Sequence, residues 1–175
     1  MMKKSNCFVL VLALFSALPA TAASQYTKLT SPPCRTTGVQ VEGGNSEQVC
    51  PGIFGYKLLL LDSDGRMSVT VVTPDGSNRP LDFWNNVTPH FSKVGNWAEW
   101  RIRKQGTRRL PVAIILPLDV KEDPASNAVS SYLVIVKVSQ TSACVVEEFK
   151  QAENSLAKAR RAADSASDKT CQTGN

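Results

Sequence analysis

Residues 110–146 constrain the fold of this chain most strongly, because they form its most apolar and most β-branched stretch. The stretch contains two apolar runs, 110–118 and 131–138, followed by Cys144-Val-Val. Runs of this length that are rich in Val, Ile and Leu and bounded by polar loops are typical of buried strands. We therefore predict that residues 110–146 form the centre of an antiparallel β-sheet.

The run 132–138 is apolar on both of its faces. One face carries Tyr132, Val134, Val136 and Val138, and the other carries Leu133 and Ile135. A strand of this kind needs a covering layer on each side of the sheet. The preceding run contains Pro117, which cannot donate a ladder hydrogen bond, so we expect the strand to be interrupted there by an edge or a bulge.

Flanking segments have the patterns of further strands. Residues 56–61 and 66–73 are joined by Asp62-Ser-Asp-Gly, which predicts a hairpin. Residues 97–103 alternate, which predicts a half-buried strand whose outer face carries Trp97, Glu99, Arg101 and Arg103. Residues 24–50 are polar and turn-rich, with two possible short ribbon arms at 35–41 and 48–49.

Two segments have helical signals. Residues 151–166 carry a small-residue stripe at spacings of three and four, made of Ala152, Leu156, Ala159, Ala163 and Ala166. Thr88-Pro89 resembles a helix start and Gly95 a helix end, so we predict one short helical turn at residues 90–94.

The first 22 residues have the pattern of a signal peptide. Met1-Met-Lys-Lys is followed by a short apolar run from Cys7 to Leu18, and Ala20-Thr-Ala fits the cleavage pattern after Ala22. A retained membrane anchor is the alternative, which the shortness of the apolar run disfavours. Cleavage removes 22 of 175 residues and two lysines, leaving 153 residues and lowering the formal charge from +5 to +3. This mild charge does not indicate a nucleic-acid partner, and no stable membrane insertion is expected after cleavage.

Cys34, Cys50, Cys144 and Cys171 remain after removal of the leader. An even number of cysteines in an exported chain indicates two disulfides, for which three pairings exist. Sequence distance favours Cys34–Cys50 and Cys144–Cys171. A strand leaving Cys144 and a helix returning over it bring Cys171 back to the start, which supports the second pair.

We therefore predict an α+β fold in residues 23–175, as a single domain. It consists of an antiparallel β-sheet or half-barrel with β-meander order, a C-terminal α-helix packed on it and two disulfides.

Catalytic patterns are sparse in the sequence. His90 is the only histidine, and we interpret it as a surface or helix-turn residue because no nucleophile elbow accompanies it. Asp82 and Glu99 stand beside aromatic residues as a possible hydrolase pair, although solvated strand charges explain them more simply. The aromatics Phe83, Trp84, Phe91 and Trp97 are read as plugs at the sheet edge, with a ligand site as the alternative. We expect no metal and no cofactor.

One site-like feature is basic. The segment 97–109 combines an aromatic ring with several cations, and the candidate anion-binding patch is Trp97, Arg101, Arg103, Arg108 and Arg109. Arginine beside an exposed indole suits an anionic envelope polymer or an acidic protein surface. The alternative is a solvated edge whose charges discourage association between sheets.

Several motifs also occur together in a known family. They are Cys50-Pro-Gly, Gly55-Tyr56, Phe83-Trp84, Ala98-Glu-Trp-Arg101, Ser131-Tyr-Leu-Val134, Cys144-Val-Val146 and an alanine-rich helix ending near Cys171. Over most of the chain after the leader, this set resembles a family of small exported proteobacterial proteins with two disulfides, whose function is unknown. The resemblance implies a periplasmic or secreted bacterial protein with matching cysteine positions, and it implies no catalytic or binding residue.

The function expected from these observations is that of an exported, non-enzymatic binding or accessory protein of the cell envelope. The alternative is a proteinaceous inhibitor of an extracellular enzyme such as lysozyme. Such inhibitors offer acidic residues to a basic target, and the mildly basic composition disfavours that alternative.

Overall fold

The computed structural model describes residues 22–40 and 44–174, within which eleven strands form one sheet. The predicted signal peptide, residues 1–22, lies outside the described residues except for Ala22. The strands are β1 (Ala23–Lys28), β2 (Arg35–Gln40), β3 (Asn45–Pro51), β4 (Lys57–Ser63), β5 (Arg66–Val72), β6 (Asn78–Pro80), β7 (Phe91–Val94), β8 (Trp97–Gln105), β9 (Arg108–Lys121), β10 (Ser130–Val138) and β11 (Ala143–Lys150). The helices are α1 (Phe83–Asn86) and α2 (Ser155–Asp164), and a 3-10 turn follows at Ala166–Asp168.

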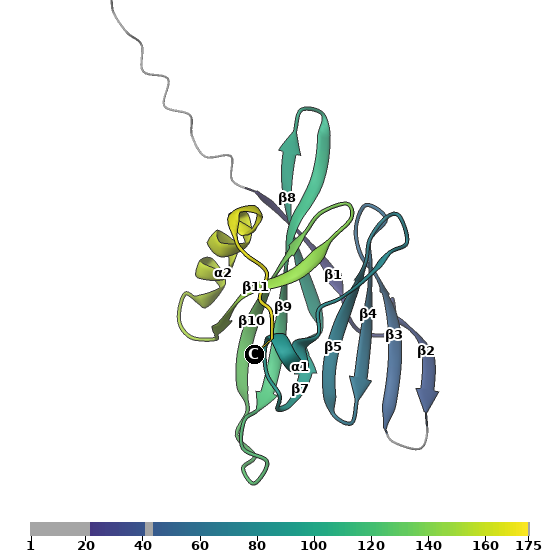
Figure 1. The fold of residues 1–175 in the computed structure, drawn as a ribbon, viewed down its shortest axis with the longest axis vertical. Coiled ribbons are helices and arrows are strands. Elements are labelled where there is room, and N and C mark those ends of the chain that lie inside the picture. The colour runs from purple at the N-terminus through teal and green to yellow at the C-terminus, as the bar shows by residue number, and fades with distance from the viewer. Residues whose placement is uncertain (1–21, 41–43, 175) are drawn as a thin grey trace, which may run out of the picture.

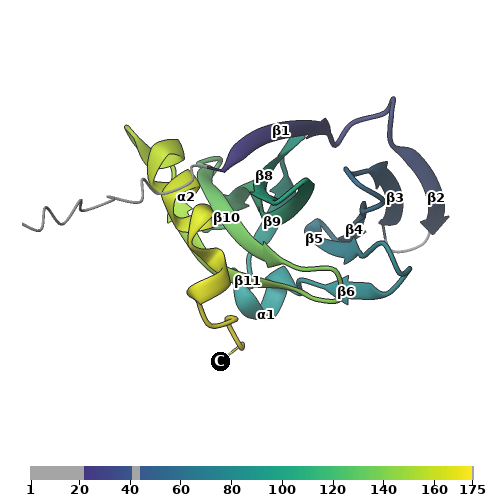
Figure 2. The same cartoon turned by 90° about the horizontal axis from the view of Figure 1, so that it is seen from above.

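The sheet curls into a half-barrel with two arms (Figures 1 and 2). Strands β2 to β5 form one antiparallel arm, and β8 to β11 form the other. Strand β7 joins the arms, because it pairs along β9 and meets β5 at the single parallel pair Arg66–Ser92. Since β1 pairs with β8 and β7 stands between the arms, the order is not a simple meander. The fold is also more β-rich than the α+β class predicted.

The core lies in two layers, one on each side of β10. Val134 and Val136 belong to the large cluster enclosed by the half-barrel. Leu133 and Ile135 belong to a second cluster, which they share with α2 alanines such as Ala159. Helix α2 packs across β9, β10 and β11 and supplies this outer layer (Figure 2). The prediction that this strand is covered on both faces is confirmed.

Helix α2 is shorter at its start than the predicted helix over 151–166. The backbone N–H of Gln151 donates to the carbonyl oxygen of Ser131 at 2.7 Å, which holds residue 151 against the sheet. Asn154 then adopts a left-handed conformation (φ 61°), so the helix starts at Ser155. Ala152, predicted as part of the buried stripe, is consequently exposed and lies outside the helix, whereas Ala163 is fully buried.

The predicted helical turn at residues 90–94 is wrong. These residues form β7, in which Phe91 pairs with Lys121 and Val94 with Leu118. The helix is instead α1, where Phe83 is buried in the core. The capping signals at residues 88–89 favour a helical turn only weakly. Pairing with β9 is more stable, because it adds hydrogen bonds and burial that an isolated turn lacks.

Strand β9 continues past Pro117 to Lys121, further than predicted. Pro117 sits where the neighbour of β9 changes from β8 to β7, and its carbonyl accepts a hydrogen bond from Gly95 N–H at 2.8 Å. A missing donor is tolerated here because the ladder on this side of β9 is interrupted between β8 and β7, while β10 pairs continuously past Pro117 on the other side. The register shift lies elsewhere, between Arg101 and Ile102 of β8.

Both predicted disulfides are confirmed, as Cys34–Cys50 and Cys144–Cys171. None of the helices in the described part of the chain has the length and apolar character needed to cross a membrane.

The polar segment at 24–50 contains β1, which the sequence pattern did not reveal because β1 lacks apolar alternation and depends on its partner β8.

The β4–β5 hairpin turn provides a stability test. Asp64 and Gly65 have φ values of 53° and 72°, the positive angles of a two-residue turn that matches strand twist. Replacing Gly65 by alanine is expected to lower the free energy of unfolding by about 1 kcal/mol, because a side chain is disfavoured at that angle. Guanidinium denaturation measures the loss. Gly38→Ala is the control, since an added Cβ there makes only ordinary contact, and equal losses in both variants would contradict the argument.

Candidate functional site

The predicted anion-binding patch is not one surface. Arg101 is only 6% exposed, because α2 covers the face of β8 that was expected to be open. Its Nε and Nη2 donate to the Asp164 carboxylate at 2.7 and 2.9 Å, and its Nη1 donates to Glu99 at 3.1 Å. Arg103 donates to the carbonyl oxygen of Asp164 at 2.7 Å. Arg101 is therefore unavailable to an external anion, and the prediction of an open charged face is wrong.

The remaining members of the predicted patch are dispersed. Trp97 packs edge-on against Tyr26, with ring centroids 5.9 Å apart. Arg108 and Arg109 are exposed at the end of the projecting β8–β9 hairpin (Figure 1). The guanidinium of Arg109 lies over the ring of Phe54, 5.8 Å from its centroid. Of the arginines in the predicted patch, the exposed ones are thus those at the hairpin tip.

Glu99 is the centre of a buried ion network between β1, β8 and α2. Its side chain is fully buried, and Arg160 Nε donates to its Oε1 at 2.8 Å. The hydroxyl of Tyr26 donates to Oε2 at 2.9 Å, and the hydroxyl of Ser24 donates to Oε1. Together with Arg101 these donors occupy both carboxylate oxygens, which is the requirement for a buried charge.

This network keeps Glu99 ionised. Burial alone would raise the pKa of Glu99, but hydrogen bonds from Arg160, Ser24 and Tyr26 outweigh it and hold the pKa below its ordinary value. Burial and the hydrogen bond to Glu99 raise the pKa of the Tyr26 hydroxyl. A carboxylate locked among donors has no free proton-transfer role, so we interpret the network as structural.

The predicted hydrolase pair is not brought together. Glu99 is buried beneath α2, whereas Asp82 is exposed at the start of α1. A carboxylate oxygen of Asp82 accepts a hydrogen bond from Asn85 Nδ2 at 2.7 Å. Two carboxylates that act on one bond must face a common substrate, and these two do not. His90 is exposed, as the surface interpretation expected.

The aromatic residues that were predicted to gather at one corner are divided by the fold. Phe83 is a buried plug and Trp97 packs against β1, but Trp84 and Phe91 are 42% and 38% exposed. The guanidinium of Arg66 lies over both exposed rings, 5.6 Å from the Trp84 centroid and 5.0 Å from that of Phe91. Cation–π contacts of this kind hold an exposed ring in place.

Trp84 borders a polar groove, which we call the α1 groove. It consists of two adjoining clefts of about 530 and 300 Å³ that share residues 87–89 and Glu148. The larger cleft is lined by Trp84, Asn85, Asn86, Val87, Thr88, Pro89, Glu148, Gln172 and Thr173. The smaller cleft adds His90, Val120, Glu122 and Tyr132. Amides, hydroxyls and carboxylates therefore dominate a groove with an aromatic ring at its border.

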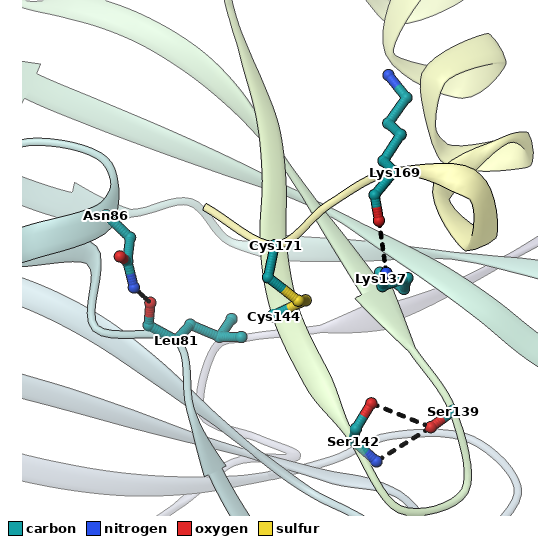
Figure 3. The surroundings of a disulfide bond; sticks show 8 residues. All are labelled: Leu81, Asn86, Lys137, Ser139, Ser142, Cys144, Lys169 and Cys171. Atoms are coloured by element: carbon teal, nitrogen blue, oxygen red, sulfur yellow. Dashed lines mark hydrogen bonds between the residues drawn. A yellow bond between two sulfur atoms is a disulfide. The ribbon is translucent and has the colours of Figure 1, made fainter. Parts of the chain in front are cut away.

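The C-terminal tail forms one wall of the α1 groove. The disulfide Cys144–Cys171 fixes the tail to β11 (Figure 3), and the backbone N–H of Gln172 donates to Val145 O at 2.8 Å. Gln172 Nε2 donates to a carboxylate oxygen of Glu148 at 2.7 Å. Its Oε1 is buried and has no hydrogen-bond partner within the described residues.

At the other end of the groove, the Tyr132 hydroxyl donates to Glu122 at 2.5 Å. This bond is the main reason why the pKa of Glu122 lies below its ordinary value. Lys150 Nζ lies 3.4 Å from the same carboxylate. Glu122 is thus an ionised acceptor at the edge of the groove.

A larger cleft of about 680 Å³ lies between the two arms of the half-barrel. Its two carboxylates are already engaged, since Asp62 accepts from Gly65 N–H and Asp119 accepts from the Ser131 hydroxyl. Within the described residues its lining contains no aromatic ring. This cleft therefore has fewer features of a recognition site than the α1 groove.

Residues 22–40 and 44–174 hold no group of three or more His, Cys, Asp or Glu side chains placed to bind a metal ion. Comparison of the chain with protein-family models, curated proteins and solved structures found no match. The α1 groove was missed at the sequence level because Trp84, Glu148 and Gln172 are far apart in the chain. The only local signal was a tryptophan followed by two asparagines.

Proposed function

We propose that this protein is an exported, non-enzymatic binding or accessory protein of the bacterial cell envelope, which recognises its ligand in the α1 groove. The main observation in support is the exposed indole of Trp84, which Arg66 holds beside a groove of amide, hydroxyl and carboxylate groups. A few converging polar groups with an aromatic ring are the usual composition of a ligand site.

A periplasmic or secreted location is part of this proposal. Two disulfides are typical of proteins that fold in an oxidising, extracytoplasmic compartment. The signal-peptide pattern of residues 1–22 and the resemblance to small exported proteobacterial proteins support the same address. The non-enzymatic role is supported by the engagement of Glu99 in a structural network and its separation from Asp82.

Capture from envelope extract tests the proposed site. The oxidised protein, immobilised, is expected to retain a ligand that Trp84→Ala fails to retain. Phe54→Ala is the matched control, because Phe54 is a similarly exposed aromatic (46%) outside the lining of the groove. Equal capture by the wild type and the Trp84 variant would refute the groove as the binding site.

The expected anionic partner would have to bind at the hairpin tip, where Arg108 and Arg109 are exposed. An anionic envelope polymer or an acidic protein surface bound there is expected to dissociate at high salt, because surface charges are screened within about 8 Å at physiological ionic strength. Capture that survives 0.5 M salt, an ionic strength chosen for the test at roughly three times the physiological value, would exclude this mode.

A second candidate function is inhibition of a basic extracellular enzyme such as lysozyme. The observation in its favour is the projecting β9–β10 connection (Figure 1), which carries Glu122 and Asp123 beside the α1 groove. Acidic groups on a projecting loop suit a basic active-site cleft. A lysozyme activity assay with the protein in excess tests it: loss of inhibition is expected for Glu122→Lys, and undiminished enzyme activity with the wild type would exclude this function.

A further inference from the structure

We propose that the α1 groove binds a neutral sugar chain and that one sugar ring stacks on Trp84. The inference rests on the proposed function and deepens it, because it names the class of ligand. Three observations support the inference: the indole of Trp84 is held in place, the groove offers hydrogen-bonding groups, and its lining carries negative charge.

The indole of Trp84 is prepared for stacking. Arg66 lies over its ring and over that of Phe91, so the two aromatic rings are held by one guanidinium. The helix that carries Trp84 is fixed by its buried neighbour Phe83, whose backbone N–H donates to the Ser68 hydroxyl at 3.1 Å. A ring that is already immobile loses little conformational freedom when a ligand packs on it.

The polar groups match a polyhydroxylated ligand. Sugar hydroxyls both donate and accept hydrogen bonds, and the groove offers amides at residues 85–86, hydroxyls at residues 88 and 173, and the Glu148 carboxylate. Gln172 Oε1 is a buried acceptor without a partner among the described residues. Gln172 lines the groove, so a ligand hydroxyl that reaches Oε1 would supply the missing donor.

The charge of the groove favours a neutral ligand over an anionic one. Its acidic lining groups are the carboxylates of Glu122 and Glu148, and among the described residues no lysine or arginine lines it. Of the cations at its border, Lys150 is paired with Glu122 and Arg66 lies over the Trp84 ring. Among the described residues Glu148 has no salt-bridge partner and accepts only from the neutral amide of Gln172. An acidic polymer would be repelled by this carboxylate, whereas a neutral glycan requires no charge partner.

The volume of the α1 groove is also large enough for a short sugar chain. Its two clefts, about 530 and 300 Å³, fall within the range of small-ligand sites and adjoin along residues 87–89. Two adjoining clefts can each take part of a ligand, which suits a short chain of sugar rings.

Titration calorimetry with two neutral probes tests the proposal. The probes are the β-1,4-linked tetrasaccharides of glucose and of N-acetylglucosamine. Binding of one probe is expected, with an affinity reduced at least tenfold in Trp84→Ala and reduced less in Trp84→Phe, which keeps an aromatic ring. Phe54→Ala is expected to bind like the wild type. Binding is also expected to be unchanged at 0.5 M salt, about three times physiological ionic strength, because no ion pair forms.

Tryptophan fluorescence gives an independent readout. Trp100 is fully buried and Trp97 is half-buried, so a ligand stacked on Trp84 is expected to change the emission of the most exposed of the three tryptophans. The change is expected to vanish in Trp84→Phe. Melting temperatures of all variants are compared, so that a loss of binding is not confused with a loss of folding.

The outcomes separate this inference from the proposed function. If neither saccharide binds but envelope capture still depends on Trp84, the glycan assignment is wrong and the groove remains the binding site. If capture is also independent of Trp84, both proposals fail. Saccharide binding that Trp84→Ala leaves intact, or a Trp84-dependent ligand that salt displaces, such as a cationic peptide, would also overturn the glycan assignment.

Discussion

Glu99→Ala is expected to lower the free energy of unfolding by about 3–5 kcal/mol, the largest effect of any substitution considered for this protein. The change removes a fully buried carboxylate and leaves Arg101, only 6% exposed, without one of its two acidic partners. It also removes the acceptor for Arg160, Tyr26 and Ser24, so three elements lose their common anchor.

Denaturation in guanidinium chloride measures this effect at pH 7. The control is Glu153→Ala, because Glu153 is exposed and lies between β11 and α2. The control is expected to change stability by less than about 0.5 kcal/mol. A Glu99 variant as stable as the control would mean that water replaces the network at no cost.

Glu99 is also expected to make the stability of the protein depend on pH. Because the folded protein holds the pKa of Glu99 below its ordinary value, the unfolded chain takes up this proton first as the pH falls. The stabilisation is thus fully present above about pH 4.3, the ordinary pKa of a glutamate, and is lost as the pH falls through the lower folded-state pKa. Glu99→Gln is expected to flatten this acid limb of the stability curve, whereas Glu153→Gln is expected to leave it unchanged.

Removing the Cys144–Cys171 disulfide by the double substitution Cys144→Ser, Cys171→Ser has the second largest expected effect. The bond closes a loop with a sequence separation of 27 residues, which corresponds to about 3.6 kcal/mol of stability on a chain-entropy argument. A second consequence is specific to this bond. Gln172 follows Cys171 directly, so release of the tail withdraws one wall of the α1 groove.

The other disulfide supplies the matched control. Cys34–Cys50 closes a loop with a separation of 16 residues, and its removal is expected to cost about 3 kcal/mol by the same argument. Neither cysteine lines the groove, so ligand capture by the Cys34→Ser, Cys50→Ser variant is expected to persist at a temperature where it remains folded. Loss of capture in both variants, or in neither, would contradict the role given to the tail.

The interior of the sheet was predictable because local pattern and tertiary environment agree there. Leu133 and Ile135 alternate with Val134 and Val136, and the structure buries each pair in a different layer. The disulfide geometry was predictable for a similar reason. A strand leaving Cys144 and a helix of known rise returning over it leave few arrangements that bring residue 171 back.

The candidate site was not predictable, because its members are brought together by packing. Arg101 belongs to an alternating strand, and alternation alone cannot tell a face open to water from one covered by a distant helix. Helix α2 covers that face and provides Asp164 as a partner, which turns a suspected anion site into a buried ion pair. Trp84 and Phe91 likewise became neighbours of Arg66 only through the arrangement of β5, α1 and β7.

The sequence by itself therefore determined the central strands, the two disulfides and the presence of a C-terminal helix, because periodicity and chain length act locally. Tertiary structure alone decided the curl of the sheet, the pairing of β1 with β8, and which charges are buried. It also decided that Trp84 meets Glu148 and the C-terminal tail in one groove. Such contacts between residues far apart in the chain depend on the packing of whole elements, which no local pattern encodes.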